Sequence, residues 1–136
     1  MSDPTRRRTP AQIRRMPNDA LMLAGRVLLG LLFLAGAVQK GLDPAPAADL
    51  LTERGLPGAL TWPALAFNAL GALCLFLGLW TRPMALALAA YCMMTSIFHL
   101  IPSDPWQMSI FVKNWAIAGG LLILAAQGPG RFALHR

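Results

Sequence analysis

The chain has 136 residues, of which 56% are hydrophobic and only 13% are charged. A soluble domain carries roughly 25% charged residues, so this composition excludes an ordinary soluble fold. The net charge of +6 does not indicate nucleic-acid binding, because the basic residues gather in the N-terminal tail and near the ends of apolar segments, as membrane orientation signals do.

Residues 1–19 are basic, polar and interrupted by proline, which predicts a disordered N-terminal tail. Four stretches with almost no charge follow it. A bilayer core of about 30 Å requires roughly 20 helical residues, with about 17 as the lower limit. The sequence therefore predicts an all-α membrane protein, a four-transmembrane-helix bundle within residues 20–130, with spans at 20–38, 63–80, 83–100 and 109–126.

The connections between the predicted spans differ in length. The first, Gln39–Trp62, is the longest. Within it we expect Ala47–Arg54 to form a short helix on the outer interface, since Pro46 precedes this segment and Gly55 follows it. Only Thr81–Arg82 joins the second and third spans, which predicts a tight helical hairpin.

The basic residues predict the orientation of the spans. Lys and Arg accumulate on the cytoplasmic side of membrane proteins. With the N-terminus inside, that side holds eight basic residues and the outer side holds two, Lys40 and Arg54. The sequence thus predicts a multi-pass protein with both termini in the cytoplasm, including a C-terminal tail at 131–136.

Arg26 is predicted to lie inside the membrane, where a charged side chain costs about 2.5–3.5 kcal/mol on insertion scales. It lies about 9 Å from the inner end of the first span. Two roles stay open for it. The side chain reaches back to the headgroups or pairs with Asp19, or it faces the bundle as a contact for an anion or a lipid headgroup.

A second group of polar residues is predicted in the outer half of the membrane. If the second and fourth spans pack together, these side chains converge into a basic, hydrogen-bonding cluster. Such a cluster serves as a polar clasp that locks the bundle, or as a binding site for a quinone headgroup or a small anion. Its members are Lys40, Asn68, His99, Lys113 and Asn114.

Chemistry of other kinds has little support in the sequence. Cys74 and Cys92 are offset by about 6 Å along the predicted hairpin, so we expect free, inert thiols. We find no Cys and His cluster for a metal and no set of nucleophile and base. The chain is therefore expected to have no covalently bound cofactor and no catalytic activity of its own, and any redox role requires a diffusible quinone or a partner.

Five segments between Gly25 and Arg131 resemble, in order and spacing, the DoxX family of bacterial membrane proteins. They are Arg26 with Val27–Gly41, LGALCLFLGLWTR at Leu70–Arg82, His99, VKNWAIAGGLLIL at Val112–Leu124, and GPGR at Gly128–Arg131. The resemblance implies a four-helix bundle in the bacterial cytoplasmic membrane. It also implies that Arg26, Lys40, His99 and Lys113 occupy polar positions that recur in the family.

One position departs from that pattern. The second span of the family often carries a glutamate where this chain has Asn68. That glutamate could neutralise Lys113. Without it, the cluster keeps its positive charge or Lys113 turns to Asp104.

The resemblance also implies a function. Relatives are named for association with quinol oxidase and thiosulfate:quinone oxidoreductase systems, so we expect an accessory subunit with membrane redox partner subunits. Two alternatives from other classes are a small transporter or channel for an anion or metabolite, and a lipid or assembly chaperone. A homo-oligomer is compatible with each.

Overall fold

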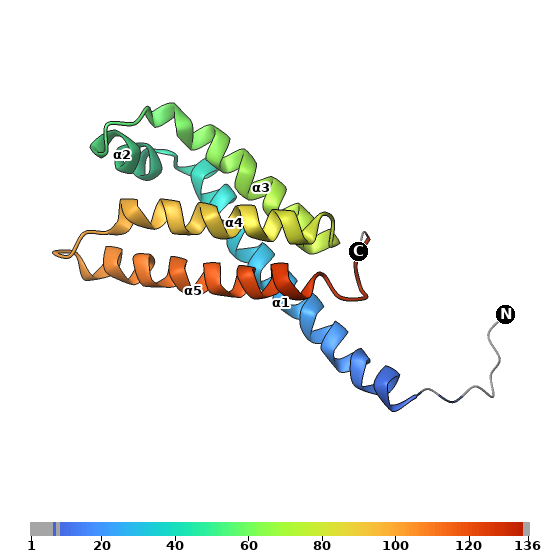
Figure 1. Cartoon of the computed structure of the whole chain (residues 1–136). Helices are drawn as coiled ribbons and strands as arrows, with labels where there is room; N and C mark the ends of the chain where they lie inside the picture. The colour runs from blue at the N-terminus through green and yellow to red at the C-terminus, as the bar shows by residue number, and fades with distance from the viewer. Residues whose placement is uncertain (1–6, 8, 135–136) are drawn as a thin grey trace.

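The computed structural model describes residues 7 and 9–134, and every regular element in this part of the chain is helical (Figure 1). The predicted all-α class is therefore confirmed. Two 3-10 turns, η1 (Gly58–Leu60) and η2 (Ile97–His99), accompany the longer helices. These helices are α1 (Pro10–Leu42), α2 (Ala45–Glu53), α3 (Thr61–Leu77), α4 (Thr81–Ser96) and α5 (Pro105–Gln127).

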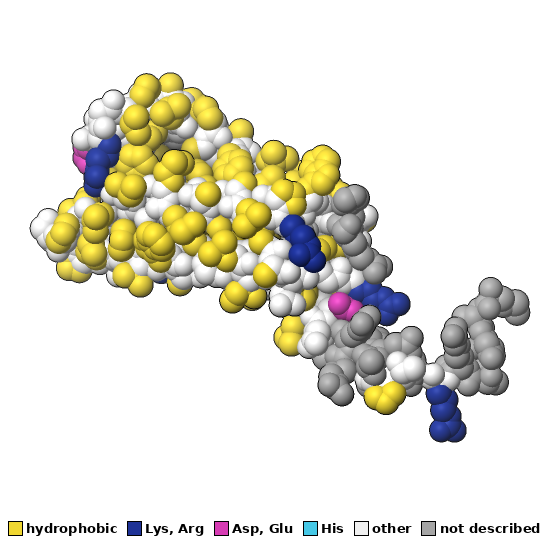
Figure 2. Space-filling view, viewed as in Figure 1, with side chains coloured by type: hydrophobic (Ala, Val, Ile, Leu, Met, Phe, Trp, Pro, Cys, Tyr) yellow, Lys and Arg dark blue, Asp and Glu magenta, His cyan; other side chains and the backbone are white. Residues whose placement is uncertain are grey.

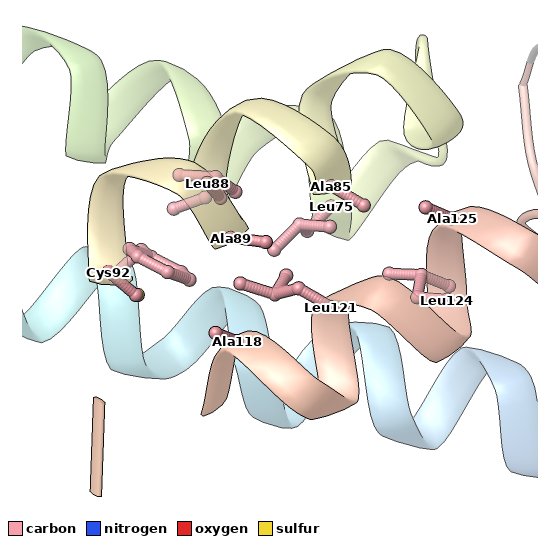
Figure 3. Packing of buried hydrophobic residues seen from close by; sticks show 11 residues of the cluster. Leu75, Ala85, Leu88, Ala89, Cys92, Ala118, Leu121, Leu124 and Ala125 are labelled. Atoms are coloured by element: carbon pink, nitrogen blue, oxygen red, sulfur yellow. The ribbon is translucent and has the colours of Figure 1, made fainter. Parts of the chain in front are cut away.

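Two helix pairs form the bundle. α1 packs along α3, α4 packs along α5, and a short turn connects α3 to α4 (Figure 1). The buried core between the pairs consists mainly of alanine and leucine, and small residues let helices approach closely inside lipid. Figure 3 labels Leu75, Ala85, Leu88, Ala89, Cys92, Ala118, Leu121, Leu124 and Ala125 in this core.

Hydrogen bonds tie loops together at both ends of the bundle. The α2 end holds α2, η1, η2 and the loop 100–104, and there Arg54 Nη2 donates to the carbonyl of Ile97 (2.8 Å). The tail end holds Asp19, the turn between α3 and α4, and residues 128–134. There the backbone N–H of Leu134 donates to the carbonyl of Leu77 (3.0 Å).

The exterior of the bundle is apolar between its two ends. Ile123 is 66% exposed, and many other large apolar side chains on α1, α3, α4 and α5 also face outward. Figure 2 shows hydrophobic side chains over most of one face, with charged side chains towards the two ends. Three helical stretches are long and apolar enough to cross a membrane: Asn18–Leu42, Gly58–Leu77 and Pro105–Gln127. The predicted membrane protein is confirmed, with the lipid-facing surface on the outside of the bundle.

The first helix begins at Pro10, so residues 10–19 are helical where the sequence predicts a disordered tail. Proline suits the first position of a helix because its missing N–H would have no partner there. Arg14 and Arg15 also favour helix by intrinsic propensity. Residues 1–6 and 8 of the predicted tail lie outside the described residues.

The connection between α3 and α4 is Gly78–Trp80, and Thr81–Arg82 are instead the first residues of α4. Gly78 has a φ of +70°, and the N–H of Leu79 donates to the carbonyl of Cys74 (3.0 Å). This is the Schellman arrangement, in which a left-handed glycine ends a helix. The predicted tight hairpin is therefore present, and its turn lies earlier in the chain than expected.

The short helix predicted in the first loop is present as α2, which starts at Ala45 and ends at Glu53. Gly55 follows it with a φ of +76°, as expected for a helix stop. The predicted C-terminal tail does not extend away from the bundle. Its residues 131–134 fold back onto the tail end. Residues 135–136 lie outside the described part of the chain.

Candidate functional site

Lys40 and Asn68 meet over the backbone of α1 at Gly36. A Cβ atom placed on Gly36 would lie 3.1 Å from Asn68 Nδ2 and 3.7 Å from Lys40 Nζ. Lys40 Nζ donates to the carbonyl of Gly36 at 3.4 Å, a long hydrogen bond. The missing side chain at Gly36 therefore makes room for two polar groups from different helices.

Asn68 is the buried member of this group, with 3% of its surface exposed. Its Oδ1 atom has no hydrogen-bond partner among the described residues. Tyr91 of α4 lies beside Asn68 and its side chain interacts with the amide. We call Gly36, Lys40, Asn68 and Tyr91 the Lys40–Asn68 site, because they bring α1, α3 and α4 together around an unsatisfied amide.

The other predicted members of the outer cluster lie elsewhere. His99 Nδ1 donates to Gln107 Oε1 (2.6 Å), since an amide oxygen can only accept. Lys113 is exposed and Asn114 half-buried on α5. α3 makes no extensive contact with α5, so the packing that would bring Lys113 to Asn68 is missing. The structure brings Lys40 and Asn68 together and leaves His99, Lys113 and Asn114 apart from them.

The carboxylate of Asp104 is also engaged elsewhere. Its Oδ1 accepts from the backbone N–H groups of Trp106 (3.0 Å) and Gln107 (3.4 Å) at the start of α5. It acts as the N-cap of that helix.

Sequence reasoning missed three residues that shape these contacts, namely Gly36, Tyr91 and Gln107. Tyr91 lies near the middle of the third predicted span, deeper than Asn68 in the second, so the comparison of depths did not select it. Gly36 had no signal of its own, because a glycine in a span is more often a packing contact. Gln107 lies in a loop and helix start whose geometry the sequence does not specify.

Arg26 lies at the tail end and is fully buried, with 0% exposure, so its side chain does not reach water as snorkelling requires. Its Nη2 atom donates to the carbonyl of Phe132, and its Nε and Nη1 atoms have no partner among the described residues. No ion pair joins Asp19 to Arg26 among the described residues, and Asp19 Oδ1 accepts from the backbone N–H of Arg131 (3.2 Å). The guanidinium instead faces the C-terminal segment.

Cys74 and Cys92 are both buried and both carry free thiols, as the sequence predicts. Cys92 belongs to the buried core between the helix pairs, and Cys74 lies on α3 next to the core residue Leu75. Burial among apolar side chains leaves a thiol chemically inert.

The chemistry of the Lys40–Asn68 site suits a small ligand with oxygen atoms. Lys40 Nζ has up to two donors besides the one that bonds to the Gly36 carbonyl, and the unsatisfied Asn68 Oδ1 accepts. Both helices of the α1–α3 pair contribute, so the site depends on the tertiary fold.

Comparison with known proteins supports the identity of this fold. The sequence model of the DoxX family matches residues 21–101, which run from α1 to just beyond η2. The chain is 29% identical over 119 residues to the inner membrane protein YqjF of Escherichia coli strain K12, covering 87% of this chain and 92% of that protein. It is 28% identical over 127 residues to the inner membrane protein YphA of the same strain, covering 85% of this chain and 89% of that protein.

No solved structure matches the chain. The helices that cross the membrane and the inner membrane relatives place the chain in the bacterial cytoplasmic membrane as a multi-pass protein. Since the family match covers more than half of the sequence, including α1, α3, α4 and the Lys40–Asn68 site between them, the chain belongs to the DoxX family.

Proposed function

We propose that this protein is an accessory subunit of a quinone-linked redox system, and that the Lys40–Asn68 site holds a quinone headgroup. The observation that supports the proposal is the buried Asn68 amide, whose Oδ1 has no partner, beside the ammonium group of Lys40. An unsatisfied buried amide costs about 1–3 kcal/mol, so a ligand that bonds to it gains that energy.

The site matches both redox states of such a ligand. A quinone carbonyl accepts hydrogen bonds, and Lys40 Nζ and Asn68 Nδ2 can donate them. A quinol hydroxyl donates, and Asn68 Oδ1 can accept. The side chains that α1 exposes near this site, such as Leu34 and Val38, are apolar, which suits approach of a lipid-soluble ligand from the bilayer. The electron donor or acceptor would belong to a partner subunit.

We also propose that the chain crosses the membrane four times with both termini in the cytoplasm. α4 has 16 residues and is short for a span, at about 24 Å. The three residues of η2 extend it by about 6 Å, which gives about 30 Å in total and matches a bilayer core. The eight basic residues at the N-terminus and tail end against two at the α2 end support cytoplasmic termini.

Bound quinone in the purified protein tests the proposed site. The wild-type protein, extracted from native membranes in a mild detergent, should carry quinone in a near-stoichiometric amount. Lys40→Met and Asn68→Leu each remove one polar partner from the site. Each should weaken quinone binding roughly tenfold, as expected for one lost hydrogen bond to a charged or buried group.

Lys113→Met is the matched control, because it removes the same charge from an exposed position on α5. It should leave the quinone content unchanged. Equal quinone content in all three variants and the wild type, or none in the wild type, would contradict the proposal. A protein that purifies without quinone and without partner subunits would direct attention to anion flux in liposomes.

A further inference from the structure

Arg26 carries a positive charge that no described acidic side chain offsets. It is fully buried, and its single hydrogen bond runs to a neutral backbone carbonyl, that of Phe132. A buried charge without a counter-charge is costly, and breaking up a buried pair typically destabilises a protein strongly. The two donors Nε and Nη1 are buried without partners as well. Within the part of the chain that the structure describes, no anion accompanies this guanidinium.

The segment that covers Arg26 is residues 128–134, which we call the C-terminal strap. Two backbone contacts hold it besides the bond from Arg26. The N–H of Leu134 donates to Leu77 O (3.0 Å), and the N–H of Arg131 donates to Asp19 Oδ1 (3.2 Å). Residues 131–134 of the strap thus close the tail end with three hydrogen bonds.

Pro129 at the start of the strap is buried, whereas the large apolar side chains at its end bury little surface. Phe132 is 49% exposed and Leu134 is 72% exposed, so few apolar contacts are lost when they move away. Gly128 and Gly130 have φ angles of +83° and +80°, which lets the chain reverse direction between α5 and the strap. Release of residues 131–134 therefore gives up mainly the contact of Ala133 with Gly78.

Gly78, in the turn between α3 and α4, also borders the guanidinium and lies next to Ala133 of the strap. A Cβ atom on Gly78 would lie 2.1 Å from Arg26 Nη1, so only glycine lets the turn between α3 and α4 pass over the charge. When Phe132 O leaves, Nη2 becomes available next to Nε. These two donors form the edge of a guanidinium that binds an oxyanion through two parallel hydrogen bonds.

We propose that Arg26 is the recognition group of a binding site for a phosphate-type oxyanion at the tail end, and that the C-terminal strap occupies this site when no anion is bound. The site lies within the span Asn18–Leu42, close to the end where membrane headgroups are expected. The anion is the phosphate of a lipid headgroup or free phosphate, which have the same recognition chemistry. Arg82 and Arg131 at the same end add to the positive field.

The test measures the thermal unfolding temperature and the amide hydrogen exchange of residues 131–134 in the full-length protein. One set of samples is in neutral detergent, with inorganic phosphate or with chloride at equal ionic strength. The other is in the same neutral detergent, with phosphatidylglycerol or with diacylglycerol, which lacks the phosphate. Binding should raise the unfolding temperature and speed exchange at Arg131 and Leu134, because the strap is displaced. A response to inorganic phosphate identifies free phosphate as a source, and a response to phosphatidylglycerol alone identifies a lipid headgroup.

Three variants separate this site from general charge effects. Arg26→Gln should abolish the response. Arg54→Gln is the matched control, since it removes the same charge at the α2 end, where Arg54 Nη2 donates to the carbonyl of Ile97 (2.8 Å), far from the strap. Its response should match that of the wild type. Leu134→Pro removes the donor to Leu77 O and loosens the strap, so the anion should bind roughly fivefold more tightly.

The proposal is overturned if neither probe changes the wild-type protein, or if Arg26→Gln responds as the wild type does. Should Arg26→Gln fail to fold, Leu134→Pro decides the matter. Tighter binding supports competition between strap and anion, and unchanged binding overturns it.

Discussion

Gly55 and Gly78 have the same local role in different surroundings. Each ends a helix in the left-handed region, with φ of +76° and +70°, and each is followed by a backbone bond five residues back, Leu56 N–H to Leu51 O and Leu79 N–H to Cys74 O. Around Gly55 a Cβ atom would meet nothing within 4 Å. Around Gly78 it would meet Arg26 and Ala133 at 2.1 and 2.5 Å.

This pair separates backbone strain from crowding. Gly55→Ala should lower the free energy of unfolding by about 1 kcal/mol, which is the strain of a left-handed alanine. Gly78→Ala should cost at least about 1 kcal/mol more, because it also displaces a buried guanidinium. Thermal unfolding of both variants in detergent measures the difference. Equal losses would mean that the tail end rearranges freely around Arg26.

Among whole elements, α5 has the best-defined start. Asp104 lies at its N-cap and accepts from two backbone N–H groups, and Pro105 occupies the first helical position. The first N–H groups of a helix have no partner within it, so a capping side chain replaces water or lipid headgroups there. The sequence Asp-Pro before an apolar stretch is a recognised start signal.

Asp104→Ala should therefore destabilise the protein by about 1 kcal/mol, which lowers the unfolding temperature by roughly 3–5 °C. Asp49→Ala serves as the control, because Asp49 is exposed within α2 and its carboxylate caps no helix. It should change the unfolding temperature little. If both variants unfold at the same temperature as the wild type, the Asp104 cap does not contribute to the stability of the protein.

Hydropathy located every long helix, but not its ends. Apolar runs predicted α1, α3, α4 and α5 because lipid requires continuous apolar segments. The starts and stops depend on local chemistry that is weaker than this signal. Helix α1 extends into polar residues from Pro10, and the turn after α3 follows Gly78 rather than the charged Arg82.

For the whole molecule, α4 is the element that decides the topology. It is too short to count as a span alone and is packed between neighbours, with Ala85, Leu88 and Ala89 fully buried. A helix inside a bundle meets protein as well as lipid, so its composition is less apolar than that of a lipid-facing span. Four spans place both termini on one side, and three place them on opposite sides.

Reporter fusions test this topology in cells. A fluorescent protein fused after Arg136 should fluoresce, because it folds in the cytoplasm, and alkaline phosphatase at the same position should be inactive. Alkaline phosphatase inserted at Ser103, in the loop before α5, should be active outside. An active phosphatase after Arg136 would instead support three spans.

The sequence by itself determined the class of this protein, its apolar helices and its family, because these depend on composition and periodicity along the chain. It also marked Arg26, Lys40 and Asn68, since polar residues in a span stand out against an apolar background. Only the tertiary structure decided which of them meet. Lys40 reaches Asn68 because α1 pairs with α3, and Lys113 does not because α5 pairs with α4. The partner of Arg26 was equally hidden, since residue 132 approaches it only when the chain folds back after α5. Contacts between distant segments depend on how helices pair, and residue spacing along one chain does not encode that choice.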